Sequence, residues 1–282
     1  MADPKVGLVR WTKRIIVATG LCSFTFLFLY PLLWMVITSL KEPAEILISP
    51  PTIVPSEFRV QNYGDALRTV PAYQYFMNTL FLSVLNVVGT LVSCSLAAYG
   101  FACIQWKGRD ALFVVTVATM MVPFPVLMIP LYSMFQSVGW IGTLKPLWVP
   151  SFFGTAYSIF LLRQFFMTIP KDLTETARMD GCSEFRIFWQ IVLPLSKPAL
   201  LAVALFSFLS VWNDLVGPLV YITDQQQFTL ALGLQDYSNQ PGGSPYNTLM
   251  AMSVLITVPV IVLYLFGQKT FLHGISITGL RH

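Results

Sequence analysis

Charged side chains are scarce in this sequence: Asp, Glu, Lys and Arg make up 11% of the residues, whereas 55% are hydrophobic. This composition is too apolar for an ordinary soluble domain, so we expect an integral membrane protein. The net charge of +4 does not favour nucleic acid as a partner, because the basic residues are spread over separate loops and form no continuous patch.

Residues that bind metals and nucleotides are also few. His273 and His282 are the only histidines, which argues against a His-based metal site. No Gly-Lys dipeptide occurs, which excludes a P-loop of the usual form, so any ATP that powers the protein would be bound by another chain. The four cysteines lack paired spacing and are interpreted as small apolar residues; they are Cys22, Cys94, Cys103 and Cys182.

No Ser-His-Asp, Cys-His or paired-carboxylate arrangement fits a buried catalytic site. We therefore expect this chain by itself to be a non-catalytic protein.

Long apolar runs dominate what is present. A helix needs about 20 apolar residues to cross the hydrocarbon core of a bilayer. The sequence therefore predicts an all-α membrane domain over residues 15–268, with six transmembrane helices at 15–38, 76–102, 111–135, 149–168, 197–221 and 247–267. The first follows four basic residues and its apolar run is too long for a cleaved signal peptide, so it is interpreted as an uncleaved signal anchor.

The basic residues indicate the orientation of these spans. The termini, 103–110 and 163–197 would lie on one side and carry thirteen of the seventeen Lys and Arg residues. The opposite side would carry only Lys41, Arg59, Arg68 and Lys145. Because cytoplasmic loops are enriched in Lys and Arg, we expect both the 1–14 segment and the 269–282 tail to be cytoplasmic.

The stretch 170–194 is unusual because it lies between long apolar segments and yet carries seven charges. Pro170 is acceptable at the first turn of a helix, and Gly181 can adopt the left-handed conformation that ends one. A second short helix would begin at Ser183 and place Phe185, Phe188, Trp189 and Val192 on one face. The sequence thus predicts a helix-turn-helix at a membrane surface that ends at Pro194.

The same stretch resembles the coupling motif of ABC-importer permeases, which runs Glu-Ala-Ala, then Gly, then Ile-x-Leu-Pro. Here it reads Glu175-Thr176-Ala177, Gly181, Ile191 and Leu193-Pro194, with Thr176 as the one departure. The surrounding sequence resembles the carbohydrate-importer branch, similar to the smaller permease of maltose systems and the permease of glycerol-phosphate importers. The resemblance covers roughly the whole chain.

The resemblance implies the type I importer fold, with a cytoplasmic coupling helix, in a bacterial or archaeal cytoplasmic membrane. It implies a second, homologous permease, two nucleotide-binding subunits that hold ATP and Mg, and an external solute-binding protein. The residues expected to contact the ATPase are Glu175, Ala177, Asp180, Gly181, Phe185, Phe188 and Trp189. The acidic residues of this stretch are also consistent with a plain solvated face.

Few polar residues lie within the spans. The sequence Trp-Asn-Asp…Pro-Leu around Asn213 resembles a signature of carbohydrate-importer permeases. Asn213, Ser210 and Asn86 are candidates to line a translocation path, although such residues also serve helix packing or hydrogen bonding to the partner permease. The main alternative function is an ion-coupled transporter acting alone. It is disfavoured because Asp214 is near a helix end and no carboxylate is predicted at the midplane.

Two loops are assigned to the outer side. Residues 41–75 are rich in proline and are expected to be extended and turning, apart from a short helix at roughly Gln61–Arg68. Residues 222–246 contain no Lys or Arg and are rich in Gly and Pro, so we expect a mobile, exposed loop. This loop is either a plain connector or, by resemblance, a contact to the binding protein through Tyr237, Asn239 and Gln240.

Overall fold

The computed structural model describes residues 4–46, 48–240 and 245–278, and this part of the chain contains helices and no strand. The predicted all-α class is therefore confirmed. The helices that frame the molecule are α1 (Pro4–Ser39), α3 (Gln61–Thr69), α4 (Ala72–Ala102), α5 (Arg109–Ala118), α6 (Phe124–Ser137), α8 (Ala156–Phe166), α12 (Lys197–Trp212) and α15 (Tyr246–Thr278). Shorter elements connect them.

The chain divides into two compact units. Unit 1 comprises Met1–Val70 and Asp236–Val258, and unit 2 comprises Pro71–Gln235 and Pro259–His282. Within the described residues, three helices are long and apolar enough to cross a membrane, or up to six if each of three bent helix pairs counts as one span.

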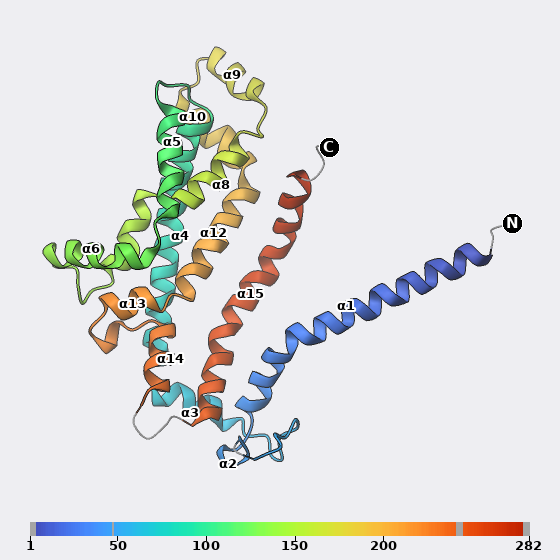
Figure 1. Ribbon diagram of the computed structural model, residues 1–282. Helices are drawn as coiled ribbons and strands as arrows, with labels where there is room; N and C mark the ends of the chain where they lie inside the picture. Colours follow the sequence, from blue (N-terminus) through green and yellow to red (C-terminus); the bar gives the residue numbers. More distant parts are fainter. Residues whose placement is uncertain (1–3, 47, 241–244, 279–282) are drawn as a thin grey trace. The chain divides into compact units, whose positions relative to one another are not determined.

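Unit 2 is built around α4, which packs against both α8 and α12 (Figure 1). Its core contains Cys94, Ala98, Leu162, Phe166 and Val203. Small residues on α4 allow close approach: a Cβ at Gly89 would lie 2.5 Å from Ser151 Oγ and 2.6 Å from a ring carbon of Phe152. Close packing of this kind stabilises helix pairs in lipid, where the hydrophobic effect between helices is weak.

The predicted span 111–135 is not one straight helix. Helix α5 and the short 3-10 turn Thr119–Met121 are followed by α6, and the two halves are bent by 99°. Val122 and Pro123 have extended backbones at the bend. The reason is that proline lacks an N–H and also disfavours helical geometry in the preceding residue. The predicted span 197–221 is likewise interrupted, because α12 ends at Trp212 and α13 (Val216–Tyr221) follows.

In unit 1, polar side chains connect the end of α1 to α3 and to the start of α15. Asn62 donates to the carbonyls of Ser39 (2.8 Å) and Lys41 (2.9 Å), and it accepts a bond from Asn247 (2.9 Å). Asn62 and Asn247 are both buried. Because these bonds satisfy buried backbone groups, they fix the chain after α1, and the short helix expected near Gln61 is confirmed as α3.

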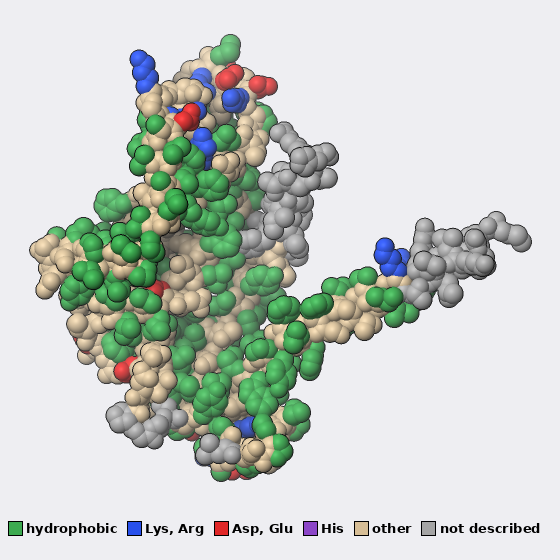
Figure 2. Space-filling model, in the orientation of Figure 1, with side chains coloured by type: hydrophobic (Ala, Val, Ile, Leu, Met, Phe, Trp, Pro, Cys, Tyr) green, Lys and Arg blue, Asp and Glu red, His purple; other side chains and the backbone are tan. Residues whose placement is uncertain are grey.

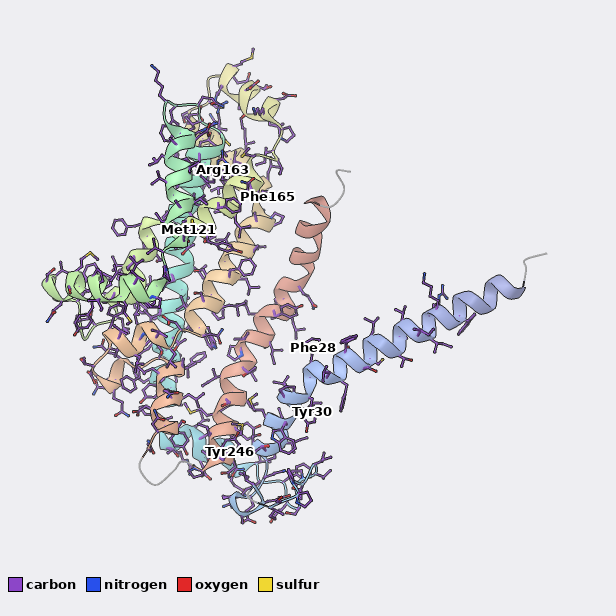
Figure 3. The ribbon with its side chains drawn as sticks, in the orientation of Figure 1. Phe28, Tyr30, Met121, Arg163, Phe165 and Tyr246 are labelled. Carbon is purple, nitrogen blue, oxygen red and sulfur yellow. The ribbon has the colours of Figure 1, made fainter. Side chains whose placement is uncertain are left out.

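Helix α1 exposes large apolar side chains, among them Phe28 and Tyr30, which are labelled in Figure 3. None of its most apolar window is buried within the protein. Such a surface is stable in contact with hydrocarbon and unstable in contact with water.

The prediction that residues 222–246 form a mobile loop was wrong for much of its length. The 3-10 turn Gln225–Gln227 and helix α14 (Leu230–Ser238) lie there, and Leu230, Leu232 and Tyr237 are buried. Burial of these apolar side chains offsets the conformational entropy that the segment loses when it is ordered. The Gln and Gly content alone had indicated a mobile loop. Residues 241–244 lie outside the described part of the chain.

The two terminal segments are largely helical. Helix α1 already begins at Pro4, within the predicted 1–14 segment, and α15 continues to Thr278, through most of the predicted 269–282 tail. Residues 1–3 and 279–282 lie outside the described residues.

Candidate functional site

The stretch 170–194, here called the charged loop, begins with helix α9 (Lys171–Met179) and turns at Gly181. Gly181 has a φ of 79°, which confirms the predicted left-handed turn. Cys182 N–H donates to the Ala177 carbonyl (3.0 Å), and Gly181 N–H donates to the Arg178 carbonyl (3.0 Å). These are the two bonds of a Schellman motif, which satisfies carbonyls that a helix end leaves free.

The second half of the charged loop begins with helix α10 (Glu184–Ile187). The Ser183 hydroxyl accepts a hydrogen bond from Arg186 N–H (3.4 Å), so Ser183 is the predicted N-cap. A π-helical turn, Phe188–Val192, follows and leads into α11 (Leu193–Leu195). The prediction that the helix ends at Pro194 was therefore wrong. Pro194 lies in the first turn of α11, where its missing N–H is not needed.

The predicted apolar stripe does not lie on one face. Phe188 and Val192 are buried, together with Ile187, whereas Phe185 is 69% exposed and Trp189 is 62% exposed. The buried face is centred on Ile187 and Phe188, where the π-helical turn begins. The prediction assumed a regular α-helix, and a π-helical turn changes which side chains share a face. The loop thus has an inner apolar face that packs on the long helices of unit 2 and an outer pair of exposed aromatic side chains.

The inner face joins the core of unit 2. Ala177, Ile187, Phe188 and Val192 pack with residues of α4 and α8. The Phe188 ring lies 5.3 Å from that of Tyr99 on α4. Burial of several apolar side chains, each worth about 1.5–3 kcal/mol, anchors the charged loop to the transmembrane helices.

A polar cluster connects the two sides of the turn to α4. Arg178 donates two hydrogen bonds to the Glu184 carboxylate, from Nε (2.6 Å) and Nη2 (3.3 Å). The Tyr99 hydroxyl donates to the same carboxylate (2.5 Å), and Arg178 also donates to the Cys103 carbonyl at the end of α4 (3.1 Å). We call this the Tyr99–Arg178–Glu184 cluster. Its bidentate geometry fixes the orientation of α9 and α10 relative to α4.

The cluster also shifts the pKa of Glu184. The hydrogen bond from Arg178 lowers the pKa of Glu184, and burial opposes that change. The carboxylate is therefore ionised at neutral pH and accepts all three hydrogen bonds, which is the state that the geometry requires.

The remaining predicted residues of the charged loop lie at its surface. Glu175 and Asp180 are exposed, and Asp180 is the residue that caps α9 before Gly181. Figure 2 shows Lys, Arg, Asp and Glu side chains gathered at the end of unit 2 that carries α9 and α10. The loop therefore presents charge and two exposed aromatic rings outward, and the inner face holds it in place.

The three candidate path residues have different surroundings. Asn213 is exposed at the end of α12 and donates to the Leu209 carbonyl (2.8 Å), and Ser210 is exposed on the same helix. Asn86 is buried on α4 and donates to the carbonyls of Leu82 and Leu147, both at 2.9 Å. In this structure Asn86 therefore joins α4 to helix α7 (Lys145–Trp148).

The three residues expected to contact the binding protein do not lie together on an exposed loop. Tyr237 is buried at the end of α14, and its hydroxyl bonds to Thr248. Asn239 and Gln240 are exposed after that helix. Tyr237 thus has a packing role in unit 1, because its ring cannot reach a partner without leaving that site.

The Tyr99–Arg178–Glu184 cluster was missed at the level of sequence. One signal was available in the sequence, because a basic and an acidic residue flank the predicted turn at Gly181. Arg178 lies in the last turn of α9, and Glu184 lies in the first turn of α10. The contribution of Tyr99, 85 residues away from Glu184, depends on the packing of α4 and has no sequence signal.

Nothing in the described residues resembles a metal centre: no group of three or more His, Cys, Asp or Glu side chains is placed to hold an ion. What the charged loop offers is a rigid connection between a polar surface and the long helices of unit 2.

Comparison with known proteins gives consistent matches. Residues 89–276 match the family described as binding-protein-dependent transport system inner membrane component. The arabinooligosaccharides transport system permease protein AraQ of Bacillus subtilis is 34% identical over 95% of this chain and 96% of its own length. The trehalose/maltose transport system permease protein MalG of Thermococcus litoralis is 30% identical over 95% of this chain and 97% of its own length.

A solved structure has the same fold over nearly the whole chain. It is a chain of a bacterial ABC transporter involved in the import of the acidic polysaccharide alginate, with a TM-score of 0.83 and 25% identity over 92% of this chain and 96% of that chain. A second structure, of an alginate ABC transporter in complex with an alginate pentasaccharide-bound periplasmic protein, has a TM-score of 0.66 over 93% of this chain and 94% of that chain.

Proposed function

The chain belongs to the family of inner-membrane components of binding-protein-dependent transport systems, and we propose that it imports a sugar or sugar-like solute as the permease of an ATP-driven importer. The observation that carries the proposal is full-length similarity to permeases whose names specify arabinooligosaccharides and trehalose or maltose. An oligosaccharide or a glycerol-phosphate type of solute both fall within this class.

The proposal includes partners that supply what this chain lacks. ATP and Mg would be bound by two ATPase subunits, because the sequence contains no P-loop of the usual form. A second, homologous permease would complete the membrane domain. An external binding protein would deliver the solute, in line with the periplasmic protein named for one structural neighbour.

The charged loop is the proposed contact to the ATPase. Its outer aromatic residues, Phe185 and Trp189, are exposed on a helix that Ile187 and Phe188 anchor to unit 2. Exposed aromatic side chains on a rigid support are typical anchors of a protein interface. The loop and both termini would then be cytoplasmic, which agrees with the distribution of Lys and Arg.

Transport would follow from motion of the helices as bodies. Closure of the ATPase pair on ATP would displace the charged loop, and its fixed connection to α4 would transmit the displacement into the membrane domain. The path would pass between this chain and its partner permease, with Asn213, Ser210 and Asn86 as candidate lining residues.

Reconstitution tests this function. The chain is co-expressed with the permease and ATPase genes of its own system and purified in mild detergent, and uptake of labelled oligosaccharides and glycerol phosphate into vesicles is measured with and without ATP and the binding protein. We expect a stable complex and uptake that needs both. Uptake by this chain alone, driven by an ion gradient, would identify it instead as a secondary transporter.

A further inference from the structure

A small basic cavity lies in unit 2 beside the charged loop and the ends of α4 and α8. It has a volume of 190 Å³ and is lined by Arg109, Arg163, Lys171 and Arg178, with Glu175 as the one carboxylate among its lining residues. This volume is below the roughly 300–1,000 Å³ of sites for drug-sized ligands. It suits a single anionic head group better than a whole oligosaccharide.

The carboxylates near the cavity do not neutralise all of this charge. Asp110 contacts two guanidinium groups, with Arg109 Nε at 3.0 Å and Arg163 Nη2 at 3.6 Å from the same oxygen. Glu184 is paired with Arg178. Lys171 forms no ion pair in the described part of the chain. With Glu175 counted, the four cations face three carboxylates, so one positive charge remains.

The cavity has apolar surroundings on its membrane side. The Arg163 guanidinium lies 4.0 Å from the centroid of the Phe113 ring on α5, and Phe101 and Phe166 line the cavity itself. Leu112 and Val115 are exposed on α5. In Figure 3, Arg163 lies on α8, in the upper half of the view near α5. The same guanidinium donates from Nε to the Phe101 carbonyl (3.2 Å) and lies 3.6 Å from the Asp110 carboxylate. Such a mixture of apolar and polar contacts is typical of an arginine at the level where hydrocarbon gives way to head groups.

We propose that this cavity binds the phosphate of an anionic membrane lipid, with the acyl chains along the exposed apolar residues of α5. Basic pockets between transmembrane helices on the cytoplasmic side bind acidic head groups in this way, and each nearby Lys or Arg strengthens such binding. Because Arg163 lies on α8 and Lys171 lies on α9, one phosphate would connect a transmembrane helix to the charged loop. The inference needs only that the chain spans a membrane, so it does not depend on the identity of the solute.

The test compares lipid retention by the assembled importer, using native mass spectrometry. The complex is purified in detergent and supplied with phosphatidylglycerol or with phosphatidylcholine of the same acyl chains. Lys171→Gln removes an exposed cation, so it leaves the core unchanged. Arg163→Gln removes a cation whose side chain is only 12% exposed. Lys107→Gln is the matched control, because Lys107 is exposed at the same end of unit 2 and does not line the cavity.

We expect the wild type to retain phosphatidylglycerol in preference to phosphatidylcholine. Lys171→Gln and Arg163→Gln should each weaken that retention about fivefold, whereas Lys107→Gln should leave it unchanged. Equal retention of the two lipids, or an equal loss with Lys107→Gln, would overturn the proposal, because surface charge alone then explains binding.

Two further readouts separate other ligands from a lipid. If millimolar inorganic phosphate displaces phosphatidylglycerol from the wild type, the cavity is a site for free phosphate and the lipid assignment is wrong. If both cavity variants release the ATPase while lipid retention is unchanged, the cations contact a protein, and the lipid assignment is again wrong. A failure of sugar uptake with lipid retention intact would count against the proposed function and leave this proposal standing.

Discussion

Arg178 and Glu184 lie on opposite sides of the turn at Gly181, and the guanidinium of the first donates two hydrogen bonds to the carboxylate of the second. The Tyr99 hydroxyl donates to that carboxylate from α4, so one ion pair connects both halves of the charged loop to a transmembrane helix. We therefore expect changes to this ion pair to impair transport without preventing the chain from folding in the membrane.

Glu184→Gln should reduce coupled transport while leaving the chain in the membrane. The amide keeps the size of the carboxylate but loses the charge that Arg178 requires, at a cost of about 1 kcal/mol for a partly exposed pair. Transport per ATP hydrolysed, measured in vesicles, is the readout. Arg186→Gln is the control, because Arg186 is an exposed cation on the same helix whose side chain, among the described residues, hydrogen-bonds only to Gln190 (2.9 Å). An equal effect of both variants would assign the loss to general charge.

The same pair predicts a pH dependence. The pKa of Glu184 is lowered from an ordinary value of 4.5, so its contribution to stability is complete above that value. The contribution is lost as pH falls through the lower, folded-state pKa. We expect thermal unfolding of the purified complex to shift to lower temperature below about pH 4.5, and Glu184→Gln to reduce that shift. An identical pH profile in the variant would mean that the pair does not contribute.

Gly181→Val should uncouple transport, because a β-branched residue at a φ of 79° costs more than about 1–2 kcal/mol. Apart from its chain neighbours, no residue has an atom within 4 Å of a Cβ built at Gly181, so the penalty comes from the backbone and not from a clash. Gly181→Asn is the matched variant, since asparagine tolerates the left-handed region. ATP-dependent uptake should be lost in the first and largely kept in the second. Normal uptake by the valine variant would contradict the role of the turn.

Trp189→Ala and Phe185→Ala should release the ATPase, because these rings are exposed on the outer side of the charged loop and aromatic anchors dominate interface energies. Co-purification of the ATPase is the measurement. Phe188→Ala is expected to act differently: Phe188 is buried, so its truncation should destabilise the permease itself by about 3–5 kcal/mol. Arg186→Ala should weaken the complex only modestly. Release of the ATPase by the Arg186 change alone would show that charge holds the interface.

Gly89→Val should destabilise the packing of α4 against the segment around Ser151. A Cβ at this position would lie within 3 Å of both Ser151 and Phe152, so added atoms force a shift that costs about 1–3 kcal/mol. Gly100→Val on the same helix is the control, because no atom lies within 4 Å of its Cβ. The yield of folded permease and its unfolding temperature in detergent should fall for Gly89→Val alone. Equal losses would point to helix propensity as the cause.

The sequence allowed the local features of the charged loop to be predicted, and the structure confirms the turn at Gly181 and the cap at Ser183. Such features depend on residues within one helical turn, where residue type largely decides conformation. The side on which Phe185 and Phe188 lie was not predictable, because a π-helical turn follows at Phe188 and burial depends on neighbours distant in sequence. Apolar residues predicted one span at 111–135, whereas the structure has two helices there, bent by 99° where Val122 and Pro123 are extended.

The segment that contains α14 is a further example. Gln, Gly and Pro in residues 222–246 indicated an exposed loop, yet Leu230, Leu232 and Tyr237 are buried in and around α14. The apolar residues Phe228, Leu230, Leu232 and Leu234 recur at every second position and not at helical spacing, so the sequence pattern did not predict helix α14.

The charged loop is fixed to α4 by both the Tyr99–Arg178–Glu184 cluster and the inner apolar face, so a displacement of the loop would tilt the whole of α4. Its 31 residues give a length of about 46 Å at 1.5 Å per residue. A tilt of about 5° at the Tyr99 end would therefore carry the Ala72 end through roughly 4 Å. That displacement is about the width of one small side chain, so a slight rotation at the proposed ATPase contact would be large enough to open or close a narrow passage at the far end of the helix.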